Sequence, residues 1–283
     1  MNLDQSASLD EIASALGRPE ILSALVIEGG QNNLVLDTGE LIVRVPRHDG
    51  ASRDLERETK VLAAIVDRLP LPIPNVAVTT LASGTVVAMH MKLPGTALLD
   101  LAGVSHSTRQ QLSDRLADFL LALHGLPVEI LGGADEPDDP LAEWSALFSE
   151  VDTKVLPLLP TDTAMAVRAR FERFLAGNGE PHPRVVIHGD FGTGNILVDN
   201  GTVSGIIDFS GCAIGDPAYD FASLSAGLGD NFLALMRRSY PGIDAMWERI
   251  CFYRSTFPLL DVLFGLEYDV SALNAGLEAL RRG

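Results

Sequence analysis

The sequence is poor in cysteine and has no long apolar run. Its two cysteines, Cys212 and Cys251, exclude a disulfide framework in a chain of 283 residues and are typical of a reducing compartment. No segment approaches the ~18–20 apolar residues that cross a bilayer, and the N-terminus lacks a basic segment followed by an apolar one. We therefore expect a cytoplasmic protein.

Positive charge is also scarce. The chain has 21 Lys and Arg against 38 Asp and Glu, which gives a net charge of −17 at pH 7. Nucleic acid and anionic membrane surfaces would be repelled, so we expect neither as a partner, whereas a cationic small molecule would be attracted. The acidic residues are spread along the chain, so this charge is weak evidence for a cationic substrate.

The composition, 47% hydrophobic and 21% charged, is that of a globular protein, and the length suits two lobes. The apolar pattern divides the chain near residue 94. Before this point we expect a helix over 1–22, strands at 24–28, 34–36, 41–45, 76–81 and 85–91, and a helix over 52–69 with Ser52 as its N-cap. After it we expect helices at 107–124, 141–149, 163–176, 217–239, 244–264 and 271–282, with one β interruption at 185–208. This pattern predicts an α+β fold: a small antiparallel sheet with one helix, then a larger helical lobe that contains a hairpin.

The β interruption contains the dipeptide Asn200-Gly201, a strong signal for a type I′ hairpin turn. If these two residues form the loop, Asp199 pairs with Thr202 and Asn195 lies opposite Ile206. Asn195 is then at the open end of the hairpin.

Asp208 is the diagonal neighbour of Asn195 on the same face of this hairpin, because side chains alternate with period two. An amide oxygen and a carboxylate on a rigid hairpin suit Mg²⁺, which takes one or two protein ligands and fills its other positions with phosphate oxygens and water. We therefore predict a metal site formed by Asn195 and Asp208.

The order His188-Gly-Asp190-x4-Asn195, followed by Asp208-Phe209-Ser210, has the spacing of the protein-kinase sequence His-Arg-Asp-x4-Asn and Asp-Phe-Gly. In kinases the first Asp accepts the proton of the attacking hydroxyl, and the Asn and second Asp hold metal ions. Loop and strand-end positions explain any one of these residues, but not all three at this spacing around a hairpin.

The N-terminal sheet offers a second kinase-like pair. Arg44 lies on the third strand, where kinases have a Lys, and Glu58 shares a helix face with Leu55 and Leu62 that should turn toward the sheet. We expect an Arg44–Glu58 ion pair near the nucleotide phosphates. A Gly-rich loop is missing, and the turn 29–33 takes its place.

Together with Ile207-Asp208-Phe209 and the segment 215–222, which reads Gly-Asp-Pro-Ala-Tyr-Asp-Phe-Ala, these motifs resemble the aminoglycoside phosphotransferase family over about residues 20–264. The resemblance is closest to the aminoglycoside 2″-phosphotransferases and somewhat weaker to the macrolide 2′-phosphotransferases. It implies a two-lobed protein-kinase-like fold with a nucleotide-binding N-lobe over 1–94 and a helical C-lobe over 95–283.

The resemblance also implies roles for individual residues. Asp190 would be the catalytic base, Asn195 and Asp208 would bind Mg²⁺, and the backbone near His90 and Met91 would contact the purine of ATP or GTP.

Other residues have supporting or acceptor roles by the same resemblance. Asp220 would accept backbone N–H groups of the catalytic loop, with His188 as its neighbour. From its own position, apart from the resemblance, Asp216 either reaches the acceptor or caps the helix that begins at Pro217. Glu248 is a candidate acceptor contact, although a solvated surface position is the favoured explanation for it.

These observations favour a phosphotransferase that moves the γ-phosphoryl group of ATP or GTP to a hydroxyl of an aminoglycoside antibiotic. A macrolide kinase or a kinase of a metabolic amino alcohol stays open, as does a nucleotide-binding pseudokinase. A protein kinase is least favoured, because no Ala-Pro-Glu sequence follows Asp208. The sequence leaves the oligomeric state open.

Overall fold

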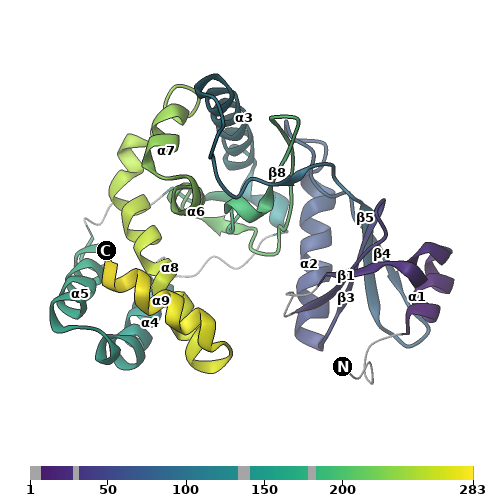
Figure 1. The fold of residues 1–283 in the computed structure, drawn as a ribbon, viewed down its shortest axis with the longest axis horizontal. Helices are drawn as coiled ribbons and strands as arrows, with labels where there is room; N and C mark the ends of the chain where they lie inside the picture. Colours follow the sequence, from purple (N-terminus) through teal and green to yellow (C-terminus); the bar gives the residue numbers. More distant parts are fainter. Residues whose placement is uncertain (1–7, 28–31, 133–140, 178–182, 283) are drawn as a thin grey trace.

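The computed structural model describes residues 8–27, 32–132, 141–177 and 183–282. These residues form two lobes, a β-rich N-lobe and a larger helical C-lobe (Figure 1). In the view of Figure 1 the N-lobe is on the right, and the C-terminus lies on the side of the C-lobe that faces away from it. This agrees with the predicted α+β fold of a small sheet followed by a helical lobe.

The N-lobe sheet is antiparallel, with the strand order β1-β2-β3-β5-β4. Its strands are β1 (Leu25–Ile27), β2 (Asn33–Asp37), β3 (Leu41–Pro46), β4 (Ala77–Thr80) and β5 (Val86–Met91). Alternate residues of β3, namely Leu41, Val43 and Val45, are buried, as a strand with one face on a core requires. Val43 and Val45 pack in one cluster with Ile12 of α1 (Leu9–Leu16), which is followed by the 3₁₀ turn η1 (Pro19–Ser23).

Helix α2 (Asp49–Ile65) follows β3 and buries Leu55, Glu58 and Leu62 along one face, as predicted. The predicted N-cap was wrong. His48, not Ser52, caps the helix, and its Nδ1 accepts the backbone N–H of Ala51 at 3.1 Å. A histidine ring nitrogen can replace the usual side-chain oxygen as acceptor here, so the helix begins one turn early.

The C-lobe is built from seven α-helices within the part of the chain that the structure describes. They are α3 (His106–His124), α4 (Ala142–Glu150), α5 (Thr161–Leu175), α6 (Ala218–Leu228), α7 (Asp230–Met236), α8 (Trp247–Glu267) and α9 (Val270–Arg282). Short 3₁₀ or π segments are η2 (Val128–Leu131), η3 (Val151–Val155), η4 (Leu156–Leu158), η5 (Thr193–Asn195) and η6 (Asp244–Met246). The predicted helix over 217–239 is two helices, because Gly229 adopts a φ of 78° between them.

The predicted hairpin is formed by β8 (Ile196–Asp199) and β9 (Thr202–Ile206), and Asp199 pairs with Thr202 as expected. The expected pairing of Asn195 with Ile206 was wrong. Ser204 is an extra residue in β9, so Ile196 pairs with Ile206 instead. The backbone carbonyl of Asn195 accepts the N–H of Ile207 at 2.9 Å, which keeps Asn195 next to the segment leading to Asp208.

Two further strand pairings lie in the described part of the C-lobe, and one of them adds a strand to this hairpin. β6 (Thr96–Ala97) pairs with β8, and β7 (Val185–Ile187) pairs with β10 (Ala213–Gly215). The connection from the N-lobe therefore runs directly into the hairpin sheet, and the boundary near residue 94 stays a prediction.

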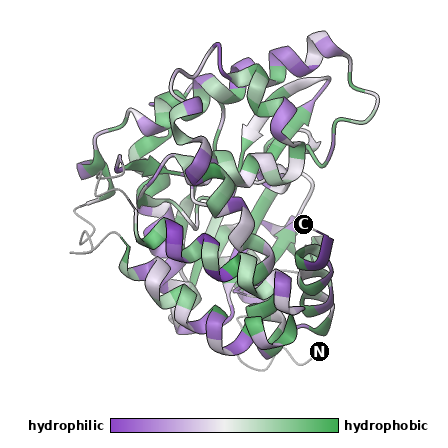
Figure 2. Cartoon of the chain, turned by 90° about the vertical axis from the view of Figure 1, so that its left-hand side faces the viewer, coloured by the Kyte–Doolittle hydropathy of each residue, from purple (hydrophilic) through white to green (hydrophobic). Residues whose placement is uncertain are grey.

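One apolar core extends from the C-lobe to α2, and the N-lobe sheet packs around a second one. Val61, Leu62 and Ile65 of α2 belong to the same buried cluster as the C-lobe helices. In Figure 2, individual helices carry both hydrophobic and hydrophilic residues, as helices with one buried face do. Among the described residues, no helix combines the length and the apolar character needed to cross a membrane.

Candidate active site

The loop after β7 brings Asp190 and Asn195 together. The Asn195 amide nitrogen donates to both the backbone carbonyl and the carboxylate Oδ2 of Asp190, each at 2.9 Å. These two bonds fold the loop into a compact unit. Burial raises the pKa of Asp190, and the negative charge of Asp208 acts in the same direction.

Asp208 lies just beyond β9, in a left-handed backbone conformation with a φ of 63°. This conformation costs a residue other than glycine about 1–2 kcal/mol, and such strain is often found at functional sites. The carboxylate Oδ1 of Asp208 accepts the Ser210 hydroxyl at 2.7 Å and the Ser210 backbone N–H at 3.4 Å. The turn therefore fixes the direction of the Asp208 side chain.

The donor set of Asn195 and Asp208 fits Mg²⁺. The described hydrogen bonds of Asn195 use its nitrogen, and those of Asp208 use Oδ1, so Asn195 Oδ1 and Asp208 Oδ2 have no protein partner among the described contacts. Two oxygens from an amide and a carboxylate suit a hard cation that takes its remaining ligands from phosphate and water.

His188 connects the catalytic loop to the segment before Asp208. Its buried ring accepts the Asp190 backbone N–H on Nδ1 at 3.3 Å, and its Nε2–H donates to the Ile207 carbonyl at 3.2 Å. Burial lowers the pKa of His188, which agrees with a neutral ring that donates with one nitrogen and accepts with the other. His188 thus holds backbone groups next to Asp190 and Asp208.

Asp220 of α6 holds the start of the loop that carries Asp190. Its fully buried carboxylate accepts the backbone N–H of His188 at 2.8 Å and that of Gly189 at 2.9 Å. The family resemblance had implied that Asp220 accepts backbone N–H groups of this loop, and these are the two that it accepts. A buried carboxylate needs such donors, because an unpaired one would be strongly destabilising.

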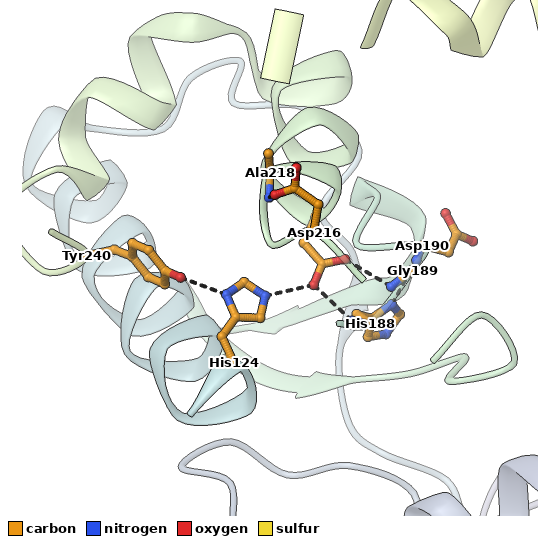
Figure 3. A network of polar contacts seen from close by, with 8 residues as sticks. His124, His188, Gly189, Asp190, Asp216, Ala218 and Tyr240 are labelled. Atoms are coloured by element: carbon orange, nitrogen blue, oxygen red, sulfur yellow. Dashed lines mark hydrogen bonds and ion pairs between the residues drawn. The ribbon is translucent and has the colours of Figure 1, made fainter. Parts of the chain in front are cut away.

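His124 and Tyr240 complete the surroundings of Asp220, and the sequence did not reveal this role. His124, the last residue of α3, donates from Nε2 to Asp220 at 3.1 Å, and its Nδ1 lies 2.9 Å from the Tyr240 hydroxyl. Figure 3 shows the contact between Tyr240 and His124 as a dashed line, and a second dashed line leaves the other side of the His124 ring. Burial raises the pKa of Tyr240 to about 12, so its hydroxyl keeps the proton that it donates to His124.

The expected Arg44–Glu58 pair is present in the N-lobe. An Arg44 guanidinium nitrogen lies 2.7 Å from a Glu58 carboxylate oxygen, and the Glu58 side chain is 4% exposed. Burial raises the pKa of Glu58, whereas Arg44 opposes this shift. Arg44 Nε is buried and has no protein partner among the described contacts.

His90 and Met91 lie in β5, where they pair with Ile42 and Leu41 of β3. The ring Nδ1 of His90 is 2.8 Å from the Met91 carbonyl, and burial lowers the pKa of His90. Their contact with a purine stays a prediction. In the turn at 29–33, the residues 29–31 lie outside the described part of the chain.

Asp216 is engaged within the C-lobe. Its carboxylate accepts the Ala218 backbone N–H at 3.0 Å, the Tyr253 hydroxyl at 3.0 Å and the Arg249 guanidinium at 2.6 Å. Asp216 thus bonds the first N–H of α6 but is not its N-cap, which is Pro217, and its other bonds tie it to α8. A role toward the acceptor stays a prediction.

Glu248 is exposed on α8 and lines a cavity of about 1470 Å³ between α5, α8 and α9. Asp190, Asn195 and Asp208 do not line this cavity. The structure thus does not bring Glu248 together with the predicted catalytic residues, and the sequence signal for it was only its charge.

The lobes and the hairpin define a mixed fold of the kinase-like class. A model of the phosphotransferase enzyme family matches residues 23–253, and the chain belongs to this family. It is therefore an enzyme of the phosphotransferase class.

Individual relatives cover most of the chain. The viomycin phosphotransferase of Streptomyces vinaceus is 28% identical over 287 residues, which cover 96% of this chain and 97% of that protein. An aminoglycoside 3′-phosphotransferase of Enterococcus faecalis is 25% identical over 77% of this chain and 82% of its own length. Among solved structures, the GDP and kanamycin complex of APH(2″)-IIIa has a TM-score of 0.86 at 23% identity and covers 96% of both chains, which shows the shared fold.

Proposed function

We propose that this phosphotransferase moves the γ-phosphoryl group of ATP or GTP to a hydroxyl group of an antibiotic, with an aminoglycoside as the favoured acceptor. The observation that carries the proposal is the convergence of Asp190, Asn195 and Asp208 at the open end of one hairpin. The negative charge of the chain adds weak support for a cationic acceptor.

In this proposal Asp190 orients the acceptor hydroxyl and accepts its proton. The Asn195 bond to Oδ2 leaves Asp190 Oδ1 without a described partner, so one carboxylate oxygen is available to a hydroxyl. Deprotonation increases the nucleophilicity of the oxygen that attacks phosphorus, and the position of the carboxylate sets the direction of attack.

Asn195 and Asp208 would hold Mg²⁺, which when bound supplies positive charge that screens the phosphate oxygens. Arg44, oriented by Glu58, would contact phosphate oxygens from the N-lobe side. The backbone near His90 and Met91 would bind the purine. These groups act on charge that is spread over the transferring phosphoryl group, so positioning and electrostatics supply most of the rate acceleration.

A second acceptor is favoured by one specific finding. The match to a viomycin phosphotransferase extends over 96% of this chain, which makes viomycin a candidate acceptor beside the aminoglycosides. A macrolide acceptor and a metabolic alcohol stay as further alternatives within the same reaction, and a nucleotide-binding pseudokinase is the alternative without transfer.

An acceptor screen tests the proposal. Purified protein is incubated with Mg²⁺ and with ATP or GTP, in separate reactions, against kanamycin, gentamicin, viomycin, erythromycin and homoserine, and mass spectrometry detects the phosphorylated product. We expect product with an aminoglycoside or viomycin, and none with Asp190→Asn. Asp199→Asn is the matched control, because Asp199 is exposed in the same hairpin sheet. Product with erythromycin alone or homoserine alone would replace the proposed acceptor by a macrolide or a metabolic alcohol. Nucleotide binding without any product would support the pseudokinase alternative.

A further inference from the structure

The backbone turn that follows Asp208 is in contact with both lobes. Cys212 donates its backbone N–H to the Phe209 carbonyl at 3.0 Å, which closes a tight turn over residues 209–212. Asp208 enters this turn in the left-handed conformation described above. Residues 208–212 are called the Asp208 turn below. The strained backbone of its first residue, Asp208, must be held in place by the surrounding structure.

On the C-lobe side, the Asp208 turn packs backbone against backbone on the catalytic loop. Gly189 has a φ of 80°, and a Cβ atom placed on it would lie 2.1 Å from the Gly211 carbonyl oxygen. A Cβ placed on Gly211 would in turn lie 3.2 Å from the Gly189 carbonyl carbon. Because Asp190 follows Gly189 directly, a shift of the Asp208 turn would shift the predicted catalytic base as well.

On the N-lobe side, the Asp208 turn is held by Arg57 of α2. An Arg57 guanidinium nitrogen donates to the carbonyl oxygen of Cys212 at 2.6 Å, across a sequence separation of 155 residues. The neighbouring residue Glu58 also lies against this turn, since the Phe209 backbone N–H and the Asp208 carboxylate both influence the pKa of Glu58. Two successive residues of α2 thus meet the turn that orients Asp208.

We propose that Arg57 is a positioning residue, which fixes the Asp208 turn, and through Gly211 the catalytic loop, against α2. Arg57 touches neither the substrates nor the metal in this role; it acts through the Cys212 carbonyl. The inference rests on the proposed phosphoryl transfer for its kinetic consequence, but its structural consequence exists without nucleotide or metal.

The alternative is that Arg57 is an ordinary surface residue of α2. Arg57 is an exposed residue, so this alternative predicts that removing the guanidinium changes neither the turn nor catalysis. Arg53 provides a matched control, because it is an exposed arginine one turn earlier on the same helix.

The test compares Arg57→Gln, Arg57→Lys and Arg53→Gln with the wild type. Amide hydrogen exchange of residues 209–213 is measured first, in protein free of nucleotide and metal. A charge-assisted hydrogen bond that is partly screened by solvent should slow exchange by about three- to tenfold, or about 0.6–1.4 kcal/mol. We expect Arg57→Gln to lose this protection, Arg57→Lys to retain part of it, and Arg53→Gln to match the wild type.

The second readout is the Mg²⁺ concentration that gives half-maximal transfer. Arg57→Gln should raise it by a similar three- to tenfold factor, because Asp208 is then less well oriented before Mg²⁺ binds. Equal exchange and equal Mg²⁺ dependence in Arg57→Gln and Arg53→Gln would overturn the proposal. If the exchange changes as expected but no acceptor is phosphorylated by the wild type, the proposed function fails and the positioning contact stands. If Arg57→Gln does not fold, the same comparison between Arg57→Lys and the wild type decides the point.

Discussion

The buried carboxylate of Asp220 gives the sharpest prediction about stability. It accepts three hydrogen bonds, from the backbone of His188 and Gly189 and from His124, and it is inaccessible to water. In Asp220→Asn, one oxygen remains as an acceptor and the new NH2 group faces groups that are themselves donors. At least one buried donor is then unpaired, and the side chain has lost the charge that strengthened all three bonds.

We expect Asp220→Asn to lower the free energy of unfolding by about 3–5 kcal/mol, the range found when one partner of a buried charged network is removed. Tyr240→Phe removes only the outer hydroxyl of the network and should cost about 0.5–1.5 kcal/mol. Asp118→Asn, at an exposed position of α3, should change stability by less than about 0.5 kcal/mol.

Urea unfolding followed by circular dichroism at pH 7 measures all three variants. Because Tyr240 reaches Asp220 only through His124, Tyr240→Phe should cost less in the Asp220→Asn background than in the wild type. A decrease in the free energy of unfolding below about 1 kcal/mol for Asp220→Asn would refute the reasoning. Such a decrease is what the loss of one ordinary hydrogen bond causes, so the network around Asp220 would then add nothing beyond a single bond.

Three further predictions concern neighbouring residues. Because burial lowers the pKa of His188, the unfolded chain binds its proton at a higher pH than the folded chain does, so stability should fall as the pH drops below about 6.5 by up to about 1.4 kcal/mol per unit. His188→Asn should reduce this slope in urea unfolding at several pH values, and an unchanged slope would contradict the prediction. In thermal unfolding, Gly189→Ala should lower the stability by more than about 3 kcal/mol or prevent folding. Gly84→Ala has a similar φ of 86° but open space around it, so it should lower the stability by about 1–2 kcal/mol. Equal losses would count against the packing argument. Arg44→Met should leave Glu58 buried without its partner, destabilise the protein by about 1–3 kcal/mol and raise the KM for nucleotide. Adding Glu58→Gln should restore the stability but not the KM. If both recover, Arg44 does not belong to the nucleotide site.

Local signals predicted local structure well. The dipeptide Asn200-Gly201 gave the hairpin turn and the pairing of Asp199 with Thr202, because a type I′ turn depends on two adjacent residues. The register further along the hairpin was wrong, since no pattern in the sequence marks Ser204 as the bulge.

The candidate site was predicted from the spacing of the motifs, and in the structure Asp190 and Asn195 are in contact, as expected. What the sequence missed depends on contacts between distant segments. His124 and Tyr240 are 116 residues apart, and Arg57 and Cys212 are 155 residues apart. A histidine at a helix end and an arginine on a helix surface have many structural uses, so only the tertiary fold reveals their partners.

The central claim is that Asp190 accepts the proton of the acceptor hydroxyl. A single-turnover experiment tests this claim most directly. Enzyme in excess over ATP or GTP labelled in the γ-phosphate is mixed with the acceptor identified by the screen, and label on the acceptor is followed over time, while calorimetry gives the affinity for the nucleotide. For Asp190→Asn we predict unchanged nucleotide affinity and a transfer rate lower by about 10²–10⁴-fold, the contribution of a general base, with Asp199→Asn at the wild-type rate. Transfer by Asp190→Asn at the wild-type rate, with intact nucleotide binding, would contradict the account.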